Sequence, residues 1–92
     1  MKYVVAYDIS ADAVRTRLAR LLEGFGVRVQ ESVFECRLDE NELERLTAAV
    51  TRELEACEDG EVRVYRVCAD CLAASFGIGR SVRRAGPGPL VV

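Results

Sequence analysis

The sequence predicts one α+β domain whose strands and helices follow in the order β-α-β-β-α-β. Two observations lead to this prediction. Apolar side chains recur at helical spacing in two separate stretches, and the segments around these stretches are short apolar or alternating runs rich in β-branched residues. The length of 92 residues leaves room for a single hydrophobic core.

The first strand is predicted from the apolar run over residues 3–7, which is typical of a strand covered on both faces. The run ends at Asp8, where the strand meets the next loop. A buried carboxylate without a partner costs several kcal/mol, so Asp8 calls for a cation, a helix terminus or water. Asp8 and Ser10 are therefore either residues that start the following helix or, for Asp8, a metal or catalytic residue.

The remaining elements follow from local patterns. Residues 11–25 carry one apolar stripe and predict a helix that ends at the glycines of residues 24 and 26. Residues 27–38 predict two short strands, because the apolar positions change parity around residues 30–32, as at a tight connection or bulge. Asp39 and Glu42 have capping-box spacing at the start of a second helix, and residues 62–67 predict a further strand.

This order is the ferredoxin-like arrangement, in which both helices cover one face of a four-stranded sheet. The first strand is nevertheless apolar on both sides, since Tyr3 and Val5 alternate with Val4 and Ala6. The open face of the sheet needs a cover. We expect a second copy of the chain to pack against it, sheet to sheet, about a twofold axis.

The domain boundary is predicted after residue 72. Residues 1–72 form the ferredoxin-like domain, and residues 73–92 form a C-terminal extension rich in glycine and proline. Because the chain ends in the apolar run Leu90-Val91-Val92, we expect part of this extension to dock. The prediction is an extra short strand, within residues 73–79 or 89–92, on the edge of the chain's own sheet or its partner's.

The chain contains no histidine, which excludes Ser-His-Asp and Cys-His catalysis and zinc sites that use histidine. Hydrolysis would have to use carboxylates, metal-bound water, Tyr, Ser or Arg. Of the four cysteines, Cys68 and Cys71 form a C-x-x-C pair, but a second such pair is missing, so a four-thiolate zinc site is not expected. The pair is expected to follow the last core strand rather than to join a strand to a helix, so free reduced thiols are predicted.

Charge is distributed unevenly along the chain. The formal net charge is −2, yet residues 38–61 hold nine acidic and two basic side chains, and residues 62–92 hold five basic and one acidic. Arginine, whose planar fork matches phosphate oxygens, supplies nearly all the cations. The chain has no apolar run near the roughly 20 residues that cross a bilayer, and its N-terminus lacks signal-peptide features, so we expect a cytoplasmic protein without membrane contact.

Three blocks of sequence carry a family resemblance: VVAYDIS at residues 4–10, R-x-R-L-A-R-L-L-E-G-F-G-V-R-V-Q-x-S-V-F-E-C-R-L at 15–38, and V-R-V-Y-R-V-C-A-D-C at 62–71. With these blocks in this order, residues 1–72 resemble the small CRISPR-associated endoribonuclease family, the second of the two Cas proteins used in spacer acquisition. The resemblance implies a ferredoxin-like homodimer, a metal-dependent nuclease acting on single-stranded RNA or double-stranded DNA, and a complex with the Cas integrase.

The resemblance also implies site residues. The strand-end aspartate of the family falls on Asp8, preceded by Tyr7, and its S-V-F block falls on Ser32 and Phe34. These four are the predicted catalytic residues, although Phe34 is equally a candidate for core packing. Asp8 is the predicted metal ligand. A single carboxylate holds magnesium poorly, so we expect one Mg²⁺ per dimer, shared by Asp8 of the two copies.

The arginines of the family's first helix fall on Arg15 and Arg17, which are predicted to bind phosphates of the nucleic acid, with Arg28 as a further candidate. The alternative function is a non-catalytic scaffold, in which the arginine-lined dimer holds duplex DNA for the integrase through backbone contacts. Only the nuclease requires Asp8. A VapD-like toxin ribonuclease is another alternative. Acylphosphatase is set aside, because the G-x-R-V-Q run lies after the first helix and leads into Glu31.

Overall fold

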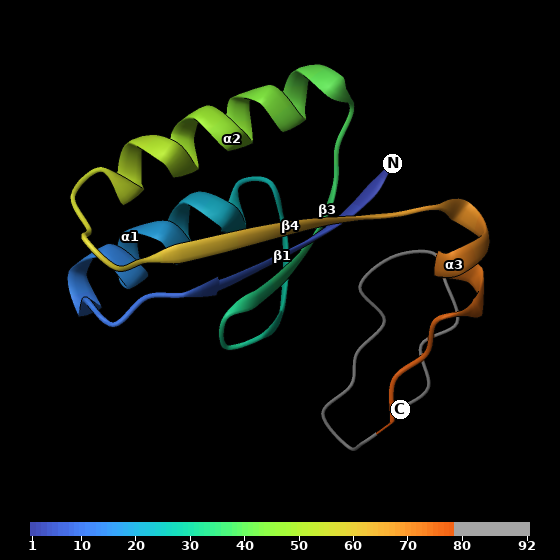
Figure 1. Ribbon diagram of the computed structural model, residues 1–92. Coiled ribbons are helices and arrows are strands. Elements are labelled where there is room, and N and C mark those ends of the chain that lie inside the picture. Colours follow the sequence, from blue (N-terminus) through green and yellow to red (C-terminus); the bar gives the residue numbers. More distant parts are fainter. Residues whose placement is uncertain (79–92) are drawn as a thin grey trace.

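Four strands form one antiparallel sheet in the order β2-β3-β1-β4 (Figure 1). The computed structural model describes residues 1–78. Its elements are β1 (Lys2–Asp8), α1 (Asp12–Glu23), β2 (Gly26–Gln30), β3 (Val33–Arg37), α2 (Glu40–Leu54), β4 (Glu61–Val67) and α3 (Ala69–Ala74). The predicted order β-α-β-β-α-β and the four-stranded sheet are confirmed.

Strand β1 lies at the centre of the sheet and pairs with both β3 and β4. Val5 is opposite Phe34 on one side and Val64 on the other, while Asp8, the last residue of β1, is opposite Glu61. Residues directly opposite each other in an antiparallel pair share a face of the sheet. The odd-numbered residues of β1 therefore face the helices, and the even-numbered residues, Asp8 included, face the other way.

Helices α1 and α2 both lie on the same face of the sheet (Figure 1). Their apolar stripes pack on the odd-numbered side chains of β1 and on β3, and Leu18, Leu22, Leu46 and Phe34 at the centre of this core are completely buried. The helical periodicity of the sequence arises from this burial, since a helix on a sheet hides one stripe only.

The two helices begin differently. The side chain of Asp39 accepts a hydrogen bond from the Glu42 amide at 2.7 Å, and the side chain of Glu42 accepts one from the Asp39 amide at 2.9 Å. This confirms the predicted capping box at the start of α2, an arrangement whose loss typically costs about 1 kcal/mol. Helix α1 follows Ala11, which has no side-chain cap.

The change of parity between the predicted second and third strands is a β-bulge. Arg28 is opposite Phe34 and Gln30 is opposite Val33, so Val29 is the extra residue of β2. Close packing holds the far end of this hairpin, where a Cβ on Gly26 would lie 2.3 Å from the Glu35 carbonyl oxygen. Glycine is therefore required there for β2 to approach β3.

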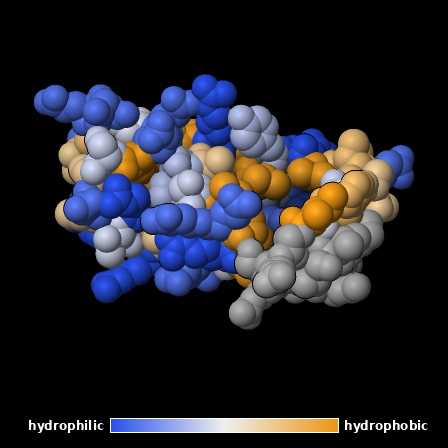
Figure 2. Space-filling model, turned by 90° about the horizontal axis from the view of Figure 1, so that it is seen from below, coloured by the Kyte–Doolittle hydropathy of each residue, from blue (hydrophilic) through white to orange (hydrophobic). Residues whose placement is uncertain are grey.

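The second face of the sheet carries Val4 and Ala6, which are half-buried, and the aromatic ring of Tyr65, which is 51% exposed. Lys2 is almost completely buried and pairs with Glu35 on this face at 2.8 Å. Figure 2 looks onto this side of the molecule, where hydrophobic side chains gather from the centre toward the right of the view. A second copy as the cover of this face stays a prediction.

The segment after β4 differs from the predicted one. Residues 69–74 form the short helix α3, so the proposed domain boundary after residue 72 falls inside a helix. Residues 73 and 74 end this helix and residues 75–78 form no strand with the chain's own sheet. Pairing of residues 73–79 with a partner's edge stays a prediction. The alternative position, residues 89–92, lies outside the described residues. Within residues 1–78, no helix is long and apolar enough to cross a membrane.

Candidate functional site

Asp8 ends β1 and its side chain is exposed. Its carboxylate forms no hydrogen bond or ion pair with the side chains or backbone of residues 1–78, although its main chain still pairs with β4. The structure contradicts the interpretation that Asp8 and Ser10 start the helix, because α1 follows Ala11 and has no side-chain cap. The carboxylate of Asp8 is thus available to a ligand.

Glu61 is a second carboxylate at this position, and the sequence analysis missed it. As the first residue of β4 it is directly opposite Asp8 on the open face of the sheet. Opposite residues of an antiparallel pair have Cβ atoms about 4.5–5.5 Å apart. The signal in the sequence was topological: if the first and last strands pair antiparallel, the end of one meets the start of the other. Glu61 is also paired with Arg63 on its own strand.

Tyr7 precedes Asp8 but points to the opposite face of the sheet, where it is buried. Its hydroxyl donates a hydrogen bond to the carbonyl oxygen of Glu31 at 3.1 Å, and its amide donates one to the carbonyl oxygen of Ser32, also at 3.1 Å. Its ring stacks on Phe34, with centroids 6.4 Å apart. Tyr7 therefore anchors the turn between β2 and β3 to the central strand.

Arg28 contacts the same turn from β2. Its Nε and Nη2 atoms donate to the Glu31 carbonyl oxygen at 3.2 and 2.8 Å, so this one oxygen accepts hydrogen bonds from two side chains. The Arg28 guanidinium also lies 5.7 Å from the centroid of the Phe34 ring. Phe34 itself is fully buried in the core. Ser32 is half-buried in the turn that these contacts hold.

Arg15 and Arg17 make internal contacts as well. Arg15 Nη1 donates to the carbonyl oxygen of Ile9 at 3.0 Å, and Arg15 Nη2 pairs with Asp12, which fixes the loop directly after Asp8. Arg17 Nε donates to Glu53 Oε2 at 3.1 Å and so links α1 to α2. These side chains are 41% and 50% exposed, which leaves part of each guanidinium open to a phosphate.

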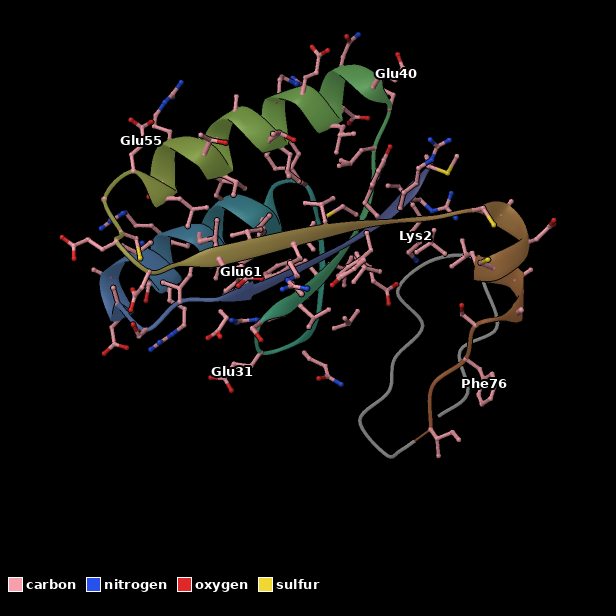
Figure 3. The ribbon with its side chains drawn as sticks, in the orientation of Figure 1. Lys2, Glu31, Glu40, Glu55, Glu61 and Phe76 are labelled. Carbon is pink, nitrogen blue, oxygen red and sulfur yellow. The ribbon has the colours of Figure 1, made fainter. Side chains whose placement is uncertain are left out.

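The predicted site residues therefore form two groups and one separate residue. Asp8 and Arg15 lie at the loop after β1, and Tyr7, Arg28, Ser32 and Phe34 lie around the β2–β3 turn, whereas Arg17 lies between the helices. The first two groups occupy the same end of the sheet, because Ala6 is opposite Val33 and Asp8 is opposite Glu61. Figure 3 labels Glu31 and Glu61 there.

The described residues contain no group of three or more Asp, Glu, Cys or His side chains that could hold a metal ion. Asp8 and Glu61 nevertheless fit magnesium, because this ion keeps several waters and is usually bound through one or two carboxylates together with substrate phosphates. Oxygen ligands alone also favour magnesium over softer metals.

A family model described as "CRISPR associated protein Cas2" matches residues 1–74. The chain belongs to the Cas2 family. This confirms the resemblance found in the sequence, and Asp8, Ser32 and Phe34 all lie inside the matched region.

Relatives of this Cas2 chain are similar over most of their length. "CRISPR-associated endonuclease Cas2 2" from Thermus thermophilus is 51% identical over 75 residues, which cover 82% of each protein. "CRISPR-associated endoribonuclease Cas2 1" from Chloroflexus aurantiacus is 45% identical over 71 residues, covering 77% of this chain and 76% of the relative. Both proteins carry the name of a nuclease.

Among solved structures, a chain of a "Partial Cas6-RT-Cas1--Cas2 complex" matches with a TM-score of 0.76 and 29% identity, covering 99% of this chain and 98% of that one. The Cas2-like fold is therefore shown. That structure is a complex of several Cas proteins, so its own Cas2 chain is found together with Cas1.

Proposed function

We propose that this Cas2 protein is a metal-dependent endonuclease that hydrolyses phosphodiester bonds in single-stranded RNA or duplex DNA and acts in spacer acquisition. The observation that carries the proposal is the carboxylate of Asp8, exposed at the end of the central strand and without a partner among residues 1–78. The nuclease names of the relatives support the reaction class.

The metal ligand is Asp8, and the ion is Mg²⁺. When bound, such an ion polarises a phosphate oxygen and lowers the pKa of a bound water. A second carboxylate has two possible sources. One is Asp8 of a second copy related by a twofold axis, which gives one ion per dimer, and the other is Glu61 of the same chain, directly opposite Asp8.

Homodimerisation through the open face of the sheet is part of the proposal. That face holds Val4, Ala6 and the exposed ring of Tyr65, which lose contact with water when a second sheet covers them. Asp8 lies on the same face, so a sheet-to-sheet dimer places the two Asp8 side chains on the side of the interface. The C-terminal extension, whose strand the sequence predicts within residues 73–79 or 89–92, would add to an edge of this assembly.

Arginine side chains would hold the nucleic acid beside Asp8. Arg15 is the best placed, since its guanidinium is bonded to the carbonyl of Ile9, the residue after Asp8, and is still 41% exposed. Arg17 and Arg28 would contribute weaker phosphate contacts, because Glu53 and the Glu31 carbonyl already bind them. Arginine contacts to phosphates do not distinguish one base sequence from another, in agreement with a substrate that is recognised by its backbone.

A scaffold that holds duplex DNA for the Cas integrase is the second candidate function. One observation favours it: a chain similar to this one occurs in a complex that includes Cas1. We also propose a cytoplasmic location, because the substrates of either function, the CRISPR array and its transcripts, lie in the cytoplasm of a prokaryote.

The test is cleavage of labelled single-stranded RNA and duplex DNA, in Mg²⁺ and in EDTA, by the full-length wild type, Asp8→Asn and Glu44→Gln. Glu44 is an exposed carboxylate on α2, and its variant matches the charge change of Asp8→Asn. We expect cleavage that requires Mg²⁺, falls about 100-fold or more in Asp8→Asn, and is unchanged in Glu44→Gln, because loss of a metal ligand exceeds the 10–100-fold cost of losing its supporting contacts.

Glu61→Gln then separates the two sources of the second carboxylate. A loss similar to that of Asp8→Asn assigns Glu61 as the second ligand, and unchanged cleavage supports two Asp8 side chains sharing one ion. Cleavage that survives Asp8→Asn contradicts the nuclease proposal. Absence of cleavage by the wild type, together with salt-sensitive binding of duplex DNA that persists in Asp8→Asn, supports the scaffold.

A further inference from the structure

The two cysteines of the C-x-x-C pair lie where a strand leads into a helix. Cys68 directly follows Val67, the last residue of β4, and is the N-cap residue of α3, while Cys71 lies in the first turn of that helix. The expectation that this pair lies away from a strand–helix junction was wrong. The expectation failed because helix α3 has only six residues, too few to show an apolar period in the sequence.

The two thiols share one side of the first helical turn. The amide of Cys71 donates a hydrogen bond to Cys68 Sγ at 3.3 Å, and the amide of Leu72 donates to the Cys68 carbonyl oxygen at 2.9 Å. Helix geometry places residues three apart with Cα atoms about 5 Å from each other, within the roughly 4.4–6.8 Å that a disulfide spans. Closing a disulfide therefore requires little movement of the backbone.

Exposure separates this pair from the other two cysteines. Cys68 and Cys71 are exposed, whereas Cys36 is fully buried beside Phe34 and Cys57 is half-buried. Figure 3 shows sulfur atoms in yellow beside the start of α3, at the outer end of the molecule. A small reagent in solution reaches this pair before it reaches Cys36, whose pKa is raised by burial, so that its thiol is a poor nucleophile.

The two exposed thiols also differ from each other in acidity. The pKa of Cys68 is lowered because the amide and then the thiol of Cys71 donate hydrogen bonds to its sulfur. The pKa of Cys71 is raised, because its thiol donates that bond and lies beside the Cys68 sulfur. An attacking thiol and a resolving thiol with these properties are what thiol–disulfide exchange requires.

We propose that Cys68 and Cys71 form a redox-active dithiol that exchanges with low-molecular-weight disulfides and closes to an intramolecular disulfide. The Cys68 thiolate attacks one sulfur of the small disulfide, whose S–S bond breaks and releases one thiolate. Cys71 then gives up its proton to the solvent and attacks the Cys68 sulfur, and the second small thiolate leaves. The protein loses two hydrogen atoms, and the small disulfide is reduced to two thiols.

Formation of a disulfide between Cys68 and Cys71 would affect the connection between β4 and the segment after α3. Helix α3 connects β4 to the segment that begins at Ser75, and the Ser75 hydroxyl donates to the Cys71 carbonyl oxygen at 2.6 Å. A disulfide across the first turn therefore ties this connection to the end of β4. This inference is independent of the nuclease proposal, because Cys68 and Cys71 lie at the opposite end of β4 from Glu61.

The test uses the full-length protein in mixtures of reduced and oxidised glutathione, quenched with acid, denatured and labelled with a mass tag for free thiols. We expect the wild type to lose two tags and to yield a peptide with a Cys68–Cys71 disulfide. Treatment with dithiothreitol should restore both tags. Cys71→Ser should retain glutathione on Cys68, since the resolving thiol is gone. Cys57→Ser is the matched control and should still form the Cys68–Cys71 disulfide.

Other results overturn the proposal. These are four tagged thiols in the wild type at every glutathione ratio, glutathione held on Cys57 rather than Cys68 in Cys71→Ser, or disulfides only between chains. A rate measurement on the folded protein tests the roles of the two thiols directly: brief labelling with iodoacetamide at pH 7 should modify Cys68 several-fold faster than Cys71. Equal rates contradict the assigned roles of the two thiols.

Discussion

The loop after β1 and the turn between β2 and β3 lie at the same end of the sheet, yet their polar groups are used in opposite ways. In the first, the carboxylate of Asp8 has no partner among residues 1–78. In the second, the carbonyl of Glu31 accepts hydrogen bonds from both Tyr7 and Arg28. The predicted site residues therefore differ in role: Tyr7 and Arg28 hold the β2–β3 turn in place, whereas the Asp8 carboxylate is available to bind a ligand.

The largest expected effect concerns the turn. Phe34→Ala should lower the free energy of unfolding by about 3–5 kcal/mol, because it removes a fully buried ring that supports both Tyr7 and Arg28. Urea unfolding followed by circular dichroism measures this change. Val27→Ala on the neighbouring strand is the control, since its side chain is 49% exposed and should change stability by no more than about 0.5 kcal/mol.

A small loss of stability in Phe34→Ala would contradict the structural role assigned to the β2–β3 turn. If unfolding changed by less than about 1 kcal/mol while cleavage fell strongly, Phe34 would act on the nucleic acid rather than on the turn. A folded variant with Leu at this position keeps most of the buried volume. Cleavage that recovers in Phe34→Leu would agree with packing as the role of the ring.

Tyr7→Phe should have a smaller effect, about 0.5–1 kcal/mol, because it removes one hydrogen bond to the Glu31 carbonyl and keeps the stacked ring. The carbonyl still accepts from Arg28, so no buried acceptor loses its only partner. Thermal unfolding and cleavage rates measured together test this. Tyr3→Phe is the matched control, since the Tyr3 hydroxyl has no hydrogen bond to residues 1–78.

The cleavage rate of Tyr7→Phe decides whether Tyr7 has a structural or a catalytic role. A rate within about threefold of the wild type, which is less than 1 kcal/mol of activation free energy, would make Tyr7 a residue of the turn alone. A loss of 100-fold with stability nearly intact would return it to the catalytic residues that the family pattern implies.

Local patterns explain how much of this fold could be predicted from the sequence. The capping box of Asp39 and Glu42 and the apolar stripes of the two long helices depend on residues three and four apart, so spacing alone shows them. Helix α3 has only six residues and no apolar period, and the sequence analysis missed it.

The candidate site was predicted only in part, for a related reason. Asp8 was found because its position at the end of an apolar strand is visible in the sequence, whereas Glu61 depends on the register between β1 and β4. The internal partners of the arginines were also hidden, since Glu53 is 36 residues from Arg17. The distribution of charge along a chain shows how many cations it has, but only the fold shows which of them are already paired.

The smallest expected effect on stability is at Asp8 itself. Asp8→Ala should change the free energy of unfolding by no more than about 0.5 kcal/mol, because the exposed carboxylate has no partner among the described residues. Asp39→Ala is the matched control: it replaces an aspartate just before a helix and should cost about 1 kcal/mol through the lost capping box. Urea unfolding of both variants, without metal and at low salt, measures the difference.

Three outcomes distinguish the possible roles of Asp8. A cost equal to that of Asp39→Ala would mean that its carboxylate holds the structure, and loss of cleavage could then not be assigned to chemistry. No change supports a carboxylate kept for a ligand. A gain in stability would support it further, because Asp8 faces Glu61 across the strands and like charges on opposite residues destabilise a sheet. Added Mg²⁺ should then stabilise the wild type and leave Asp8→Ala unchanged, since an ion that binds only the folded site raises its stability.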